Sequence, residues 1–102
     1  MNRQLRRRNQ KLKSKASEFH KILLNAIDLH SKKKFEEAET VYNRLNILQP
    51  GNYDVLRHLG ILNQDQGNYE KAYNFFLKSI EIKPDGYEAI SNLGTIHLFN
   101  KN

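Results

Sequence analysis

Residues 53–86 read YDVLRHLGILNQDQGNYEKAYNFFLKSIEIKPDG, and this stretch decides the fold. Apolar residues from Val55 to Leu62 recur at the spacing of one helix face, and Asn52 before them is a candidate N-cap. A Gly-Asn turn follows, and a second apolar face then runs to Pro84, which cannot continue a helix. The stretch therefore predicts two helices joined by a tight turn.

The residue types of this stretch recur along the chain at a fixed offset, which is the separation of Pro50 and Pro84. Other pairs at the same offset are Ala38 and Ala72, Phe35 and Tyr69, Tyr42 and Phe76, Ile22 and Leu56, Leu56 and Ile90, Ala26 and Gly60, Gly60 and Gly94, and Leu59 and Leu93. The chain therefore divides into two repeats, residues 19–52 and 53–86, and a partial repeat, residues 87–102.

Residues at fixed positions in the middle repeat carry a family pattern. They are Leu56, Leu59-Gly60, Gly67, Tyr69, Ala72, Phe76 and Pro84. This set resembles the tetratricopeptide repeat (TPR), a helix-turn-helix unit whose length matches the offset, and the resemblance covers residues 19–102. Asn63 departs from the pattern because an aromatic residue is usual there, and Asn25 departs because leucine is usual. The resemblance implies an all-α fold in which helix pairs stack into a short right-handed superhelix.

The partial repeat predicts one last helix, residues 87–99, without a second helix to pair with it. Near its end it carries Ile96, Leu98 and Phe99, and we expect some of these to face the place where a further helix would pack. The sequence therefore predicts a longer chain, homo-oligomer formation through residues 87–102, or a partner that covers this surface.

The concave face of a TPR stack is lined mainly by the first helix of each repeat. The resemblance therefore implies a groove for a protein or peptide partner, with an apolar floor at Leu23, Ile27 and Ile61. The implied groove residues are His20, Leu23, Ile27, His30, Asp54, Arg57, Ile61, Gln64, Glu88, Ser91, Thr95 and Leu98.

One TPR subgroup binds the C-terminal carboxylate of chaperones with lysine, arginine and asparagine side chains. The corresponding positions in this chain are Leu23, Ile27, His58, Glu88 and Asn92. None of these residues is lysine or arginine, and Glu88 reverses the charge. The comparison with the subgroup therefore predicts no carboxylate-clamp chaperone binding.

The excess positive charge of the chain lies in its first 17 residues. The chain has a formal net charge of +6. Residues 1–17 contain no acid and seven cations, which are Arg3, Arg6, Arg7, Arg8, Lys11, Lys13 and Lys15. Residues 18–102 contain the other ten Lys and Arg against eleven Asp and Glu, so they are nearly neutral. This asymmetry predicts a basic interaction arm, residues 1–17, before a TPR domain, residues 18–102.

Three interpretations of the arm invoke its charge. Its cations suit the phosphates of RNA or DNA with a strong salt dependence, although no aromatic ring is present to stack on bases. They also suit reversible binding to an anionic membrane surface. An organelle transit peptide is a third interpretation, because the arm is rich in arginine and free of acid.

A fourth interpretation makes the arm an extension of the first repeat helix. An apolar seam at helical spacing supports it, formed by Leu5, Leu12, Ala16, Phe19 and Leu23. Repulsion among neighbouring cations opposes it, and Ser17 is a better N-cap candidate. We therefore expect a firm helix from about Ser17 and a conditional one before it.

The sequence contains no constellation that predicts catalysis, a cofactor or a metal site. There is no cysteine, and the four histidines (His20, His30, His58 and His97) share no spacing of three or four residues. No apolar run is long enough to span a bilayer. We therefore predict that the protein is no enzyme and that it lies in the cytoplasm, with peripheral attachment to an anionic surface.

The predicted function is a non-catalytic adaptor or scaffold that binds a protein partner through the TPR surface. The basic arm would add electrostatic attachment to an anionic partner. One alternative is an RNA- or ribosome-associated protein that uses the arm. Another is the N-terminal TPR segment of a larger bacterial transferase, because the start MNRQLRRRNQK resembles the N-termini of some bacterial repeat proteins.

Overall fold

The computed structural model describes residues 3–99, with the side chains of all of these except Lys11, Leu12 and Phe99. The described residues form five α-helices and no strand, so the predicted all-α fold is confirmed. The helices are α1 (Arg3–Ser31), α2 (Phe35–Leu48), α3 (Tyr53–Asp65), α4 (Tyr69–Ile82) and α5 (Tyr87–Phe99). None of these helices is both long enough and apolar enough to cross a membrane.

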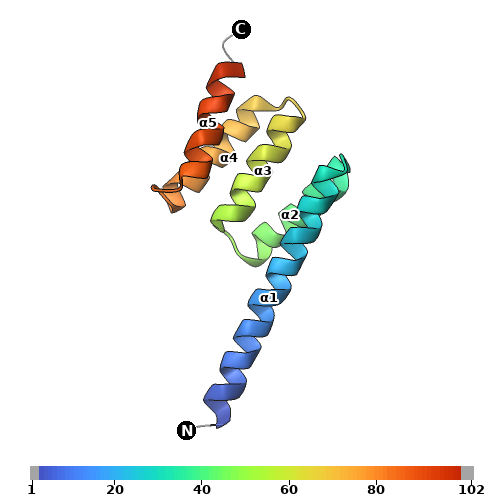
Figure 1. The fold of residues 1–102 in the computed structure, drawn as a ribbon, viewed down its shortest axis with the longest axis vertical. Coiled ribbons are helices and arrows are strands. Elements are labelled where there is room, and N and C mark those ends of the chain that lie inside the picture. The colour runs from blue at the N-terminus through green and yellow to red at the C-terminus, as the bar shows by residue number, and fades with distance from the viewer. Residues whose placement is uncertain (1–2, 100–102) are drawn as a thin grey trace.

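The helices pack in chain order, so that each helix contacts the next one along the chain. α1 pairs with α2 and α3 pairs with α4, while α5 lies against α4 and also contacts α3 (Figure 1). The first helices of successive units are therefore neighbours, as α1 and α3 also touch. Two helix pairs and a single last helix agree with the repeat period of the sequence.

The turn inside each helix pair places one residue in the left-handed backbone region. Gly67 has a φ of +80°, and Lys33, at the equivalent position of the first repeat, has a φ of +62°. Glycine adopts this conformation without strain, whereas a residue with a Cβ loses about 1 kcal/mol there. Between the pairs, the Asn52 side chain accepts a hydrogen bond from the Val55 N–H at 3.2 Å, so the predicted N-cap is confirmed.

α1 is a single helix of 29 residues that passes through Ser17 without a break. The structure therefore agrees with the fourth interpretation, in which the arm extends the first repeat helix, and the predicted N-cap at Ser17 is wrong. Arg, Lys, Gln and Leu are good helix formers, and neither glycine nor proline interrupts them before Pro50. The N-terminal half of α1 projects beyond the other helices (Figure 1). The predicted boundary between arm and repeats falls inside this helix.

Two apolar clusters hold the helices together. The first joins α1, α2 and α3 through Leu23, Ala26, Ala38, Tyr42, Leu45, Val55, Leu59 and Leu62. The second joins α4 and α5 through Ala72, Phe76 and Ile96. Within the second pair, a Cβ added to Gly60 would lie 2.5 Å from the Phe76 ring, so α3 and α4 approach closely only because residue 60 is glycine.

The apolar residues near the end of α5 do not share one environment. Ile96 is 1% exposed and belongs to the second cluster, whereas Leu98 is 76% exposed. The side chain of Phe99 lies outside the described residues. Of the residues expected to face a further helix, Leu98 is therefore exposed and Ile96 is not.

Candidate functional site

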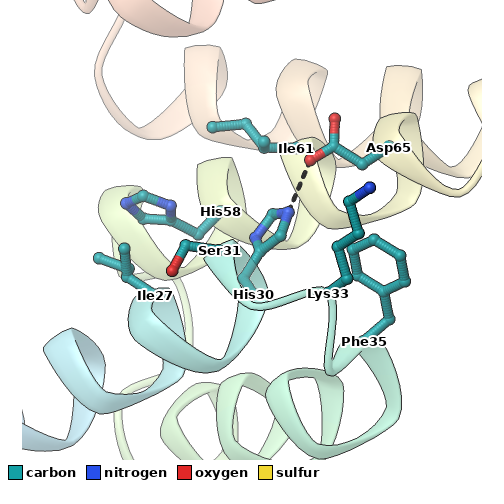
Figure 2. Close-up of a pocket in the computed structure, with 8 residues that line it drawn as sticks. All are labelled: Ile27, His30, Ser31, Lys33, Phe35, His58, Ile61 and Asp65. Carbon is teal, nitrogen blue, oxygen red and sulfur yellow. Dashed lines mark hydrogen bonds and ion pairs between the residues drawn. The ribbon is translucent and has the colours of Figure 1, made fainter.

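A pocket of about 530 Å³ opens between the end of α1, the start of α2 and the middle of α3 (Figure 2). It is lined by Ile27, His30, Ser31, Lys33, Phe35, His58, Ile61 and Asp65. Ile27, Phe35 and Ile61 provide apolar walls, and the charged residues Lys33 and Asp65 lie at its side. The pocket is open to solvent and suits an apolar side chain with polar groups beside it.

One wall of the pocket is fixed by a contact between the two repeats. His30 Nε2 on α1 lies 2.7 Å from Asp65 Oδ2 on α3, and the dashed line in Figure 2 marks this contact. The other ring nitrogen, Nδ1, lies 3.4 Å from the Tyr42 hydroxyl. Because both ring nitrogens have partners, the imidazole of His30 is held in one orientation along the pocket wall.

Aromatic rings lie behind the pocket in a continuous layer. The rings of Tyr42 and His58 stack with centroids 5.9 Å apart and planes 8° apart. His30 meets the rings of Phe35 and Tyr42 edge-on. Burial, followed by the nearby Arg57 guanidinium, lowers the pKa of His58 to about 4, so this ring is neutral at pH 7. His58 therefore adds no charge to the pocket at that pH.

A second cross-repeat contact lies at the other end of α3, where this helix begins. The Tyr53 hydroxyl donates to Glu88 Oε2 at 3.0 Å and accepts from the Ala89 N–H at 3.2 Å, which ties α3 to the start of α5. Hydrogen bonds from its own backbone N–H and from Tyr53 lower the pKa of Glu88. Tyr53 and Glu88 are separated by the same offset as His30 and Asp65. The first helices of successive repeats thus meet at an offset of one period plus one residue.

Two family models, each described as a tetratricopeptide repeat, match the chain, one over residues 24–52 and the other over residues 53–85. Together the matches cover more than half of the chain. The chain belongs to the tetratricopeptide repeat family. TPR proteins are typically non-catalytic, and their repeats indicate a role in protein–protein interaction. The matches cover neither the projecting half of α1 nor α5.

The implied groove residues of the TPR stack occupy several environments. Ile27, His30 and Ile61 line the pocket, whereas Leu23 is 7% exposed and lies in the first core cluster. The exposed members are His20, Asp54, Ser91 and Leu98. The partly buried members outside the pocket are Arg57, Gln64, Glu88 and Thr95. The structure therefore brings three of the implied residues together in one pocket.

Five further residues of the pocket were not implied by the TPR resemblance. They are Ser31, Lys33, Phe35, His58 and Asp65. Phe35 and Lys33 belong to the second helix and to the turn before it, which a groove built from first helices leaves out. A search of the sequence at an offset one residue longer than the repeat period would have found the pair His30 and Asp65.

Two buried polar atoms between α3 and α5 have no partner among the described residues. They are Arg57 Nε and Asn92 Oδ1, whose residues are separated by this same longer offset. A buried donor or acceptor without a hydrogen bond costs about 1–3 kcal/mol. Arg57 also makes no ion pair with any residue that the structure describes.

The cations of the arm lie on the surface of the TPR protein. Arg3, Arg6, Arg7, Arg8, Lys13 and Lys15 are exposed. None of these six makes an ion pair with another residue in the part of the chain that the structure describes. The side chain of Lys11 lies outside the described residues. Within residues 3–99, no group of three or more His, Asp or Glu side chains is placed to hold a metal ion.

Proposed function

We propose that this TPR protein is an adaptor that binds a segment of a partner protein on its concave face. The pocket between α1, α2 and α3 supports the proposal, because its apolar walls would take one apolar side chain of that segment. His58 is neutral and so adds no charge that a bound apolar side chain would desolvate, and the contact with Asp65 holds the His30 ring in place.

A bulky substitution at an exposed pocket residue tests this function. Ser31→Trp would fill the pocket without entering the core, because Ser31 is exposed and its hydroxyl bonds only to the Asp28 carbonyl. Peptides are first selected from a random phage-displayed peptide library on the wild-type protein. Their affinities are then measured by fluorescence polarisation, and we expect Ser31→Trp to weaken binding at least ~10-fold.

Thr40→Trp is the matched control for this experiment. Thr40 is an exposed α2 residue that also bonds to a backbone carbonyl in its own helix, and it lies outside the pocket. Its variant should bind the selected peptides like the wild-type protein. Equal affinity of the Ser31→Trp variant, or a library that yields no binding peptide, would contradict a binding role for this pocket.

The exposed cations of α1 support a second part of the proposal, electrostatic attachment of the arm to an anionic partner. Arginine pairs well with phosphate oxygens, and this property favours an RNA- or ribosome-associated role for the arm. Deletion of residues 1–15 should abolish binding to a short RNA duplex, and rising salt should weaken binding of the intact protein steeply. Binding to anionic vesicles but not to the duplex would assign the arm to an anionic membrane surface instead.

Self-association through residues 87–102 is the third part of the proposal. α5 supports it, because Tyr87, Ile90 and Leu98 are exposed apolar residues on this last described helix. A TPR stack normally buries such residues against the next helix.

A further inference from the structure

One face of α5 is uncovered where the equivalent face of α3 is packed. A Cβ added to Gly60 on α3 would lie 2.5 Å from Phe76 of α4, whereas a Cβ added to Gly94 would meet nothing within 4 Å. Leu56 is 5% exposed, and its equivalent Ile90 is 48% exposed. Within the described residues, α5 therefore presents a helix-packing face without a helix on it (Figure 1).

This face has the pattern of a helix–helix seam. Its residues are Tyr87, Ile90, Gly94 and Leu98, here called the α5 stripe, and they follow one another at steps of three, four and four residues. Tyr87 is 74% exposed and Leu98 is 76% exposed. The stripe carries no charged side chain, so its burial would desolvate no ion.

We propose that the α5 stripe binds the α5 stripe of a second copy of this chain in an antiparallel dimer with Gly94 at its two-fold axis. This inference rests on the self-association in the proposed function and specifies how the two α5 helices are arranged. Ile90 and Leu98 each lie four residues from Gly94, so antiparallel pairing places Ile90 of one copy opposite Leu98 of the other. The absent Gly94 side chain lets the helices approach closely, as Gly60 does for α3 and α4.

The charge distribution also favours a second copy over a charged partner. An uncharged stripe offers no counter-ion to a basic or acidic helix, whereas an identical stripe matches it. The cationic half of α1 lies at the end of the molecule opposite to the end of α5 (Figure 1). Pairing through α5 therefore keeps the two basic arms apart, and their mutual repulsion does not oppose the dimer.

Cysteine cross-linking tests the geometry, because the chain contains no cysteine of its own. The Gly94→Cys variant should form a disulfide-linked dimer under mild oxidation, because the two residues 94 face each other at the axis. Thr40→Cys, exposed on α2, is the control and should remain mostly monomeric on a non-reducing gel. A cross-linked fraction for Gly94→Cys no larger than that of this control overturns the proposal.

The antiparallel direction is tested by mixing two further variants. Ile90→Cys and Leu98→Cys should cross-link to each other more than either cross-links to itself. Preferential self-linking of either variant would indicate parallel helices and overturn the antiparallel arrangement.

Sedimentation of proteins without added cysteine separates this inference from the proposed self-association. The wild-type protein should sediment as a dimer at high concentration, and Leu98→Glu as a monomer with unchanged helicity, because residue 98 is exposed. A monomeric wild-type protein would overturn both ideas. A dimer that persists in Leu98→Glu would retain self-association and remove the α5 stripe as its site, and neither result bears on the pocket.

Discussion

At the residue scale, Gly60 and Gly94 are equivalent positions with opposite surroundings. Gly60→Ala should destabilise the protein by about 1–3 kcal/mol, because its Cβ would overlap the Phe76 ring. At protein concentrations where the chain is monomeric, Gly94→Ala should leave stability unchanged or raise it by up to about 1 kcal/mol, because alanine favours the helix and nothing lies near its Cβ. Chemical denaturation of both variants checks this, and similar destabilisation of the two would contradict the packing of α3 on α4.

Lys33 and Gly67 form a second matched pair, because both have positive φ at the same place in their repeats. Lys33→Gly should stabilise the protein by about 0.5–1 kcal/mol by relieving backbone strain. Gly67→Lys should destabilise the protein by about 1 kcal/mol, because lysine is strained at this positive φ. No steric clash adds to this cost, since a Cβ at residue 67 would meet nothing within 4 Å. Thermal denaturation gives both values, and a loss of stability in Lys33→Gly would show that its side chain contributes more than the strain removes.

His58 makes stability depend on pH. Its pKa is about 4 in the folded protein and 6.5 in the unfolded chain, so the unfolded chain takes up the proton first as pH falls. The contribution of neutral His58 to the free energy of unfolding is therefore fully present above pH 6.5. It is lost as the pH falls towards 4, and the loss is roughly 1–2 kcal/mol after allowance for partial solvent exposure. Denaturation midpoints between pH 7 and 4 should fall less in His58→Gln, and equal slopes in both proteins would assign the loss to other groups.

At the element scale, α1 combines a packed half and a projecting half. Ala16→Pro should remove the helicity of residues 3–15 with little change in melting temperature, because Ala16 and the described side chains before it are exposed. Asn25→Pro should cost about 3 kcal/mol or more, since it breaks α1 where the helix packs, although Asn25 is also exposed. Circular dichroism measures both, and a large loss of stability in Ala16→Pro would show that the arm packs on the repeats.

At the scale of the whole molecule, stability is distributed between neighbouring helices. Removal of residues 87–102 should lower the free energy of unfolding by about 3 kcal/mol, because Ile96 leaves its contact with Ala72 and Phe76. Removal of residues 1–15, a deletion of nearly equal length, should leave it almost unchanged. Urea denaturation compares the two, and an equal effect would contradict the separation of arm and repeats.

Much of the fold follows from local sequence. A helix face repeats about every 3.6 residues, so the positions of Leu56, Leu59, Ala72 and Phe76 predict helices and buried faces without knowledge of what covers them. The repeat period then predicts the number of helix pairs. α1 was the exception, because Ser17 is a good N-cap in isolation but continuous helix formers on both sides outweigh it.

The helices, their pairing and the concentration of charge in the arm can therefore be predicted from the sequence, because these depend on residues close together in the chain. The burial of Leu23, the contact of Asp65 with His30 and the place of Phe35 in the pocket emerge from the packing of the helices alone. The same packing covers the Gly60 face and leaves the Gly94 face open. These features depend on how helices cross, and a crossing is set by side chains from different helices that lie far apart in the chain, which no local periodicity contains.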